Sequence, residues 1–108
     1  MIRSNRADEI RELVQNSELV LLLLSGSDCN VCLSIYPDLE EMESRHNRIT
    51  FINADPEVTK ELVGEYLVFV YPTILIFADG KTFYRFERVF SLEDMEHQIN
   101  RLETMYFD

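Results

Sequence analysis

The sequence predicts an α/β fold in which a central mixed sheet of four or five strands is flanked by helices on both faces. Three features support this prediction. Short apolar runs at 19–24 and 49–54 alternate with segments of helical periodicity, as in parallel α/β units. An Asp-Gly pair at 79–80 separates two later apolar segments, which is typical of an antiparallel hairpin. A final amphipathic segment gives the expected order α, β, α, β, α, β, β, α.

The start of the chain is expected to form a helix followed by a buried strand. Residues 5–16 carry apolar side chains at helical spacing, and Ser4 or Asn5 is available as the N-cap. Residues 19–24 read LVLLLL between polar flanks. A continuous apolar run of this length suits a strand that is buried on both faces of a mainly parallel sheet.

A long amphipathic helix is expected from Cys32 onward, because apolar residues there step by three and four. Asp28 is placed to cap its start, and Pro37 interrupts it. Its apolar positions are Cys32, Ile35, Tyr36, Leu39 and Met42. Its other side carries the acidic residues Asp38, Glu40, Glu41 and Glu43, which we interpret as solvated helix surface.

The middle of the chain is expected to add a strand, a short helix and a further strand. Residues 49–54 are apolar and are followed by Asp55-Pro56, a good N-cap and first-turn pair for a helix that Gly64 weakens. Because Pro72 cannot donate a hydrogen bond to a neighbouring strand, the next strand is expected to begin after it.

The end of the chain is expected to form a hairpin and a helix. Asp79-Gly80 gives the turn, and residues 81–89 return as an antiparallel strand. Ser91 and the acidic residues after it resemble a capping box. The helix that follows carries apolar residues at positions Leu92, Met95, Ile99, Leu102 and Tyr106.

Composition excludes several classes of partner. The 108 residues carry 10 Lys+Arg against 20 Asp+Glu, a formal charge of −10, which repels nucleic acid and anionic membrane surfaces. The length suits a single domain over residues 1–108, and we expect a monomer. The apolar run at 19–24 is too short and too acidic in its flanks for a signal peptide or a membrane span. We therefore expect the cytoplasm as the compartment.

Cys29 and Cys32 are the only cysteines, and they are separated by Asn30 and Val31. The pair lies where a buried strand is expected to pass into a helix, so backbone N–H groups and the helix dipole would stabilise a thiolate. Cys29 would then be the exposed nucleophile, tuned by the residues between, and Cys32 could resolve a mixed disulfide. The same spacing also occurs in half of a zinc site. A third interpretation is that the pair is an inert remnant in a binding domain.

Several motifs together are similar to the thioredoxin family. The CNVC motif at 29–32 follows a strand, Pro37 stands five positions after the second cysteine, and Tyr-Pro-Thr at 71–73 precedes a strand and the Asp-Gly turn. The similarity runs over residues 5–104 with the parts in order. It implies a thioredoxin-like fold and thiol-disulfide exchange that needs no metal and no organic cofactor.

The resemblance also implies a substrate-binding surface at Val70, Tyr71 and Pro72. In the family the proline matching Pro72 is cis and lies beside the cysteines, although a trans loop proline is the alternative. The glycines that give partners close access in the family match Val70 and Arg88 here.

This sequence departs from the family at positions that bear on its chemistry. Asp28 replaces the aromatic residue before the first cysteine, and Ser25 replaces the usual tryptophan. The buried acid and its lysine partner match Leu23 and Phe51. A carboxylate beside Cys29 opposes its thiolate, which favours the disulfide form of the pair.

The histidines and three aromatic residues have simpler interpretations. We expect His46 and His97 to be surface residues, because neither has ligand-like spacing to the cysteines. Tyr36, Phe69 and Tyr71 are expected in the core, and a hydrophobic groove near the cysteines is the alternative for them.

The function predicted from the sequence is thiol-disulfide oxidoreduction in cell redox homeostasis. Reduced Cys29 would attack a disulfide in a protein or a small molecule, and Cys32 would release the reduced partner by forming an internal disulfide. A thioredoxin reductase or a low-molecular-weight thiol would supply the electrons.

Two other functions stay open at this point. The first is a binding or adaptor module with a thioredoxin fold and cysteines that no longer turn over. The second is a metal or cluster site shared between two chains through the cysteine pair.

Overall fold

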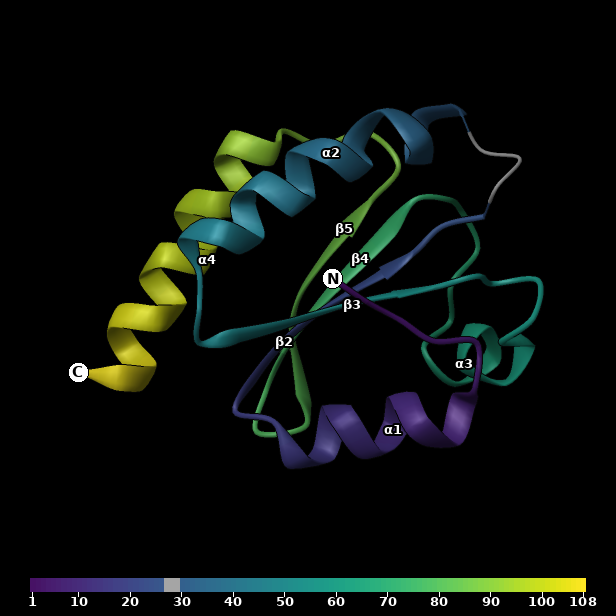
Figure 1. The fold of residues 1–108 in the computed structure, drawn as a ribbon, viewed down its shortest axis with the longest axis horizontal. Helices are drawn as coiled ribbons and strands as arrows, with labels where there is room; N and C mark the ends of the chain where they lie inside the picture. The colour runs from purple at the N-terminus through teal and green to yellow at the C-terminus, as the bar shows by residue number, and fades with distance from the viewer. Residues whose placement is uncertain (27–29) are drawn as a thin grey trace.

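The computed structural model describes residues 1–26 and 30–108, with the side chains of residues 30 and 31 left aside. In this part of the chain five strands form one mixed sheet with helices on both faces (Figure 1), which confirms the predicted fold class. In chain order the elements are β1 (Ile2–Arg3), α1 (Ala7–Asn16), β2 (Leu19–Leu24), α2 (Asn30–Arg45), β3 (Ile49–Ala54), α3 (Lys60–Glu65), β4 (Thr73–Ala78), β5 (Lys81–Glu87) and α4 (Leu92–Phe107).

The strands lie in the order β1-β3-β2-β4-β5. β1, β3 and β2 are parallel, whereas β4 pairs antiparallel with both β2 and β5. The parallel half followed by an antiparallel hairpin therefore agrees with the prediction. The short edge strand β1 was not predicted, because two residues carry no recognisable pattern.

The apolar strand β2 lies at the centre of the sheet, and all six of its residues are buried. Leu19, Leu21 and Leu23 belong to the core cluster that includes residues of α2 and α4. The alternate residues of the strand belong to a second cluster with residues of α1 and α3. Figure 1 shows the same arrangement, with α2 and α4 on one face of the sheet and α1 and α3 on the other.

Two predicted helix starts are wrong. Helix α1 begins at Ala7 after Arg6, and Ser4 accepts a hydrogen bond from the Arg6 backbone N–H at 3.3 Å instead of capping the helix. Helix α3 begins at Lys60, since the Asp55 carboxylate accepts from the Glu57 N–H at 2.9 Å. In both cases the polar side chain closes a turn before the helix, where it competes with capping.

The hairpin after β4 has the predicted turn. Asp79 and Gly80 have φ angles of 51° and 79°, as a type I′ turn requires. Strand β5 ends at Glu87, two residues before the predicted end at 89, because Arg88 has a φ of 50° and leaves the extended region. The Tyr106 hydroxyl donates to the Asp79 carboxylate, an interaction that holds the end of α4 against the turn and raises the pKa of Tyr106 to about 12.

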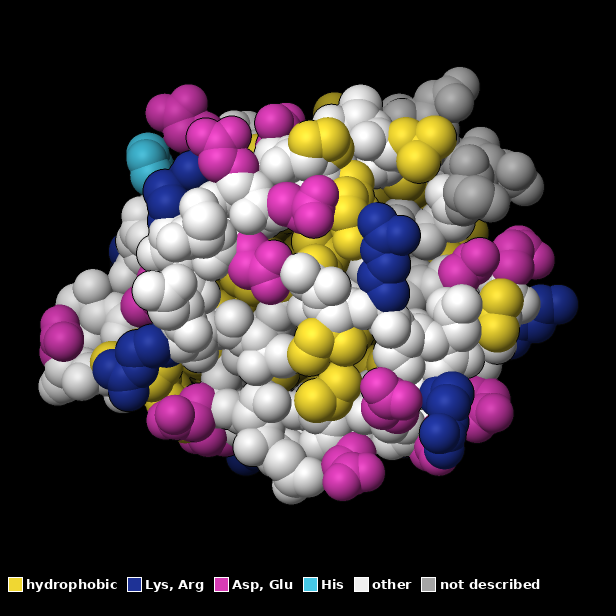
Figure 2. All heavy atoms as spheres, in the orientation of Figure 1, with side chains coloured by type: hydrophobic (Ala, Val, Ile, Leu, Met, Phe, Trp, Pro, Cys, Tyr) yellow, Lys and Arg dark blue, Asp and Glu magenta, His cyan; other side chains and the backbone are white. Residues whose placement is uncertain are grey.

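Charged side chains are distributed over the surface. On the face shown in Figure 2, acidic side chains are spread broadly, with basic side chains between them. No helix among the described residues has both the length and the apolar character that a bilayer crossing needs. On the face shown in Figure 2, the acidic side chains do not gather in one patch.

Candidate functional site

Cys32 lies in the first turn of α2 and is 2% exposed. Helix α2 leads from the end of β2 at Leu24, so the described part of the chain has the predicted change from strand to helix. The predictions for Asp28 and Cys29 lie outside the described residues, as do those for the side chains of Asn30 and Val31.

The Tyr71–Pro72 peptide bond is cis and Pro72 is buried, so the predicted cis bond is confirmed. Thr73, the first residue of β4, pairs with Leu24, the last residue of β2. Pro72 therefore lies at the edge of the sheet from which the chain continues toward α2. The Pro72 carbonyl accepts from the Arg88 N–H at 2.7 Å, and this bond fixes the proline against the end of β5.

The predicted aromatic residues separate in the structure. Tyr36 and Tyr71 are partly buried and pack against the two core clusters. Phe69, in contrast, is 83% exposed, so its predicted place in the core is wrong. Phe69 lies in the loop between α3 and β4. Because this loop is not part of a strand or helix, no regular alternation places the side chain in the core. Leu33, next to Cys32, is also exposed, and Val70 is partly buried.

Cys32 lines a hollow of about 380 Å³ between α2 and the ends of three parallel strands. Among the described residues, the polar side chains that line it with Cys32 are Arg3, Asn5, Ser25, Tyr36, Asn53 and Asp55. Asn53 uses its side-chain N–H groups to donate to the Leu23 carbonyl at 3.2 Å and to the Ser25 hydroxyl at 3.0 Å. This polar lining was not predicted, although the single asparagine in the apolar strand 49–54 was a signal for it.

Leu23 and Phe51 are 0% and 1% exposed and lie in the same apolar cluster. The positions at which the family has an acid and a lysine are therefore fully apolar here. Any proton that leaves Cys32 must reach solvent or substrate by another route, and the polar hollow that Cys32 lines offers one.

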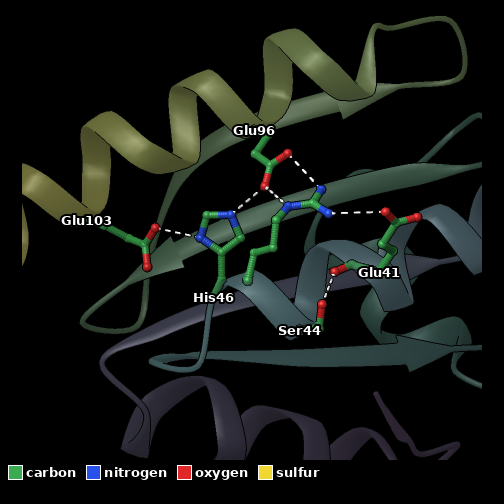
Figure 3. A network of polar contacts seen from close by, with 6 residues as sticks. Glu41, Ser44, His46, Glu96 and Glu103 are labelled. Atoms are coloured by element: carbon green, nitrogen blue, oxygen red, sulfur yellow. Dashed lines mark hydrogen bonds and ion pairs between the residues drawn. The ribbon is translucent and has the colours of Figure 1, made fainter.

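His46 is only 4% exposed, so the prediction of a surface histidine is wrong, whereas His97 is exposed as predicted. The His46 ring nitrogens lie 2.6 Å from a Glu103 carboxylate oxygen and 2.7 Å from a Glu96 carboxylate oxygen (Figure 3). Arg45 also donates twice to Glu96, at 2.9 Å each. This cluster joins the end of α2 to α4 and is far along α2 from Cys32, so its role is structural.

Metal binding was one alternative for the cysteine pair. Among the residues that the structure describes, no three or more His, Cys, Asp or Glu side chains gather as a metal site would require.

The order of the strands, the cis proline at the sheet edge and the cysteine in the first turn of α2 together define a thioredoxin fold. The structure superposes on thioredoxin from Plasmodium falciparum with a TM-score of 0.87 at 18% identity, covering 94% of this chain and 98% of that chain. It superposes on a variant thioredoxin from Halobacterium salinarum with a TM-score of 0.83 at 19% identity, covering 99% and 90%.

Sequence comparison assigns the family. The thioredoxin family profile matches residues 2–101. The chain is 25% identical to the thioredoxin-like protein YdfQ of Bacillus subtilis over 97 residues, which is 90% of this chain and 87% of that protein. It is 28% identical to a thioredoxin of Mycoplasmoides gallisepticum over 78 residues, 72% and 77% of the two chains. The chain belongs to the thioredoxin family.

Proposed function

We propose that this chain is a thiol-disulfide oxidoreductase that reduces partner disulfides through Cys29 and Cys32. The observation that carries the proposal is the position of Cys32, buried in the first turn of α2 at the sheet edge where the cis Pro72 also lies. A sulfur at a helix start is favoured as a thiolate, which is the form that attacks disulfides. Membership of the thioredoxin family supports the same activity.

The reaction has two exchange steps. The Cys29 thiolate attacks one sulfur of a partner disulfide, which releases one partner thiolate and forms a mixed disulfide. The Cys32 sulfur, after losing its proton, attacks the Cys29 sulfur and releases the second partner thiolate. The pair loses two electrons and two protons, and the partner gains both. Cys32 is shielded from solvent, which suits a residue that reacts only with Cys29.

A reductase of this kind needs a source of electrons, and a thioredoxin reductase or a low-molecular-weight thiol would serve. We propose a monomer acting in the cytoplasm, where such reductants keep thiols reduced. The substrate surface would be formed by Val70, Tyr71 and Pro72, next to the exposed Phe69.

Replacing Cys32 with Ser tests the proposal. The variant should still form a mixed disulfide through Cys29 but should not resolve it, so turnover of a disulfide substrate should fall by about 100-fold or more. Non-reducing gels and mass spectrometry of samples without free thiol would detect the trapped partner. Release of the second partner thiol would be measured in a single turnover of pre-reduced protein, because dithiothreitol would itself cleave the mixed disulfide.

Cys29→Ser is the matched control, because it removes the attacking sulfur and should trap nothing. A wild-type protein that reduces no disulfide and a Cys32→Ser variant that traps none would overturn the proposal. The apolar Leu23 and Phe51, in place of the acid and lysine of the family, favour the adaptor function in that case.

A further inference from the structure

We propose that the hollow beside Cys32 binds the α-amino-acid head group of a low-molecular-weight disulfide, such as cystine or a glutamyl peptide disulfide. This inference rests on the proposed function, because it names a substrate class for the same cysteine pair. The hollow has a volume of about 380 Å³, within the range of small-molecule sites. Among the described residues that line it, Arg3 carries a positive charge and Asp55 a negative charge.

Arg3 and Asp55 form no ion pair with each other or with any other residue that the structure describes. Arg11 and Arg45, in contrast, form ion pairs with acidic residues. Glu40 adds to the negative field at Arg3 without pairing with it. Arg3 and Asp55 line the same hollow and do not pair with each other. They are therefore complementary to a ligand that carries both a negative and a positive charge.

The Arg3 side chain is held in position by Tyr36. Its Nε donates to the Tyr36 hydroxyl at 2.8 Å, and the guanidinium carbon lies 4.7 Å from the centre of the same ring. These contacts fix the side chain, and among the described residues they use one of its five N–H donors. The remaining N–H groups have the planar arrangement that binds a carboxylate with two hydrogen bonds.

Asp55 is held in place by hydrogen bonds to its backbone and to its side chain. The Asn5 side-chain oxygen accepts from the Asp55 N–H at 3.2 Å, and one Asp55 carboxylate oxygen accepts from the Glu57 N–H at 2.9 Å. A carboxylate can accept further hydrogen bonds. An ammonium group with three N–H donors is the complementary partner for Asp55.

A small residue lines the hollow at position 25. Ser25 stands where the family has a tryptophan. The Ser25 hydroxyl accepts from Asn53, so its own hydrogen is available for a ligand. A tryptophan at position 25 would bring a large ring into this space.

The charges also exclude other ligand classes. A ligand with carboxylates alone would meet Asp55 and a chain of net charge −10, and a ligand with amines alone would meet Arg3. An α-amino acid places its carboxylate and ammonium on one carbon and is neutral overall, so it avoids both costs.

The reaction is the exchange already described, with R–S–S–R as the partner. Cys29 takes one RS group and releases the other as RS⁻, and Cys32 then displaces the bound RS⁻ as the internal disulfide forms. The disulfide gains two electrons and two protons and leaves as two RSH molecules. Dithiothreitol, a dithiol, returns the cysteine pair to the reduced state in the assay.

The test compares disulfides that differ in charge. Cystine, cystamine, dithiodipropionate and the uncharged bis(2-hydroxyethyl) disulfide are reduced by the whole chain with dithiothreitol. Glutathione disulfide is a separate arm that distinguishes a peptide source of the head group from a free amino acid. We expect kcat/KM for cystine to exceed that for the uncharged disulfide by about tenfold or more.

Substitutions in the hollow test which residues give the preference for cystine over the uncharged disulfide. Arg3→Gln and Asp55→Asn should each lower kcat/KM for cystine, and with it the ratio of cystine to the uncharged disulfide, by about tenfold. The amide oxygen introduced by Asp55→Asn would still accept from the Glu57 N–H, so the turn is kept. Arg101→Gln, an exposed arginine outside the hollow, is the charge-matched control and should change nothing. Ser25→Trp should remove the preference by filling the space.

A redox-independent measurement separates this inference from the proposed function. S-methylcysteine has the head group but no thiol, and its binding is followed by NMR shifts of Ser25 and Asn53 in the wild type and in Arg3→Gln. Binding that Arg3→Gln weakens supports the site even if no disulfide is reduced. Equal rates for charged and uncharged disulfides, together with no binding of S-methylcysteine, would overturn it while leaving the reductase proposal intact.

Discussion

At the scale of single residues, His46 connects two helices through carboxylates on both sides of its ring. Glu96 and Glu103 each place an oxygen within 2.7 Å of a ring nitrogen, so the ring lies between two carboxylates of α4. Arg45 adds a bidentate contact to Glu96. In this shielded position charge-assisted hydrogen bonds are stronger than on an open surface.

Replacing His46 with Leu should lower the free energy of unfolding by about 2 kcal/mol, because Glu96 and Glu103 would each lose a polar partner in a partly buried site. Urea unfolding followed by circular dichroism measures the change. His97→Leu is the control, since His97 is exposed on the same helix as Glu96, and it should change stability by no more than about 0.5 kcal/mol. Equal effects of the two substitutions would show that the carboxylate contacts contribute little.

At the scale of elements, α4 depends on the cap at its first turn. The Ser91 hydroxyl accepts from the Asp94 N–H at 3.1 Å, and Glu93 and Asp94 place negative charge at the positive end of the helix dipole. Further along, the helix buries the apolar stripe Met95, Ile99 and Leu102 against the sheet. The cap at Ser91 therefore sets where α4 begins, and so where its apolar residues face the sheet.

Ser91→Ala should destabilise the protein by about 1 kcal/mol, since it leaves the Asp94 N–H without its acceptor. Thermal unfolding at neutral pH measures the loss. Ser91→Asp keeps an acceptor at the same position and should retain most of the stability. A Ser91→Ala variant as stable as the wild type would contradict a capping role.

The strands could be predicted more closely than the helices, for a physical reason. The residue bounds 19–24 and 49–54 agree with β2 and β3, because strands buried in a central sheet must be apolar at nearly every position. The start of α3 could not be predicted in the same way. Asp55 serves equally as a helix cap and as a turn residue, and its neighbours in space decide between the two.

At the scale of the whole molecule, stability depends on pH through the ionisation of acidic residues such as Glu96. Hydrogen bonds from Arg45, and then from His46, lower the pKa of Glu96 to about 2 from its ordinary value of 4.5, against an opposing effect of burial. A carboxyl group whose pKa is lower in the folded state stabilises the fold. This contribution is complete at pH values above the pKa of the unfolded chain, about 4.5. This contribution is lost as the pH falls from about 4.5 toward 2.

Glu96→Gln should therefore destabilise the protein more at pH 6 than at pH 2.5, by about 1 kcal/mol, a value below the full linkage energy because Glu96 is not wholly shielded from solvent. Urea unfolding at the two pH values gives the difference. Glu93→Gln is the matched control on the exposed side of α4 and should show a smaller difference. A Glu96→Gln effect that is independent of pH would exclude the ion-pair origin of the shift.

The sequence by itself determined the α/β architecture, the central strands, the hairpin turn and the cysteine motif, because each depends on neighbours close in the chain. Only the tertiary structure decided that His46 is buried between carboxylates from α4, that Phe69 is exposed, and that Arg3 and Asp55 face one hollow beside Cys32. Arg3 and Asp55 are distant in sequence and are brought together by the parallel pairing of β1 with β3. Burial and charge pairing depend on such distant neighbours, which local periodicity does not encode.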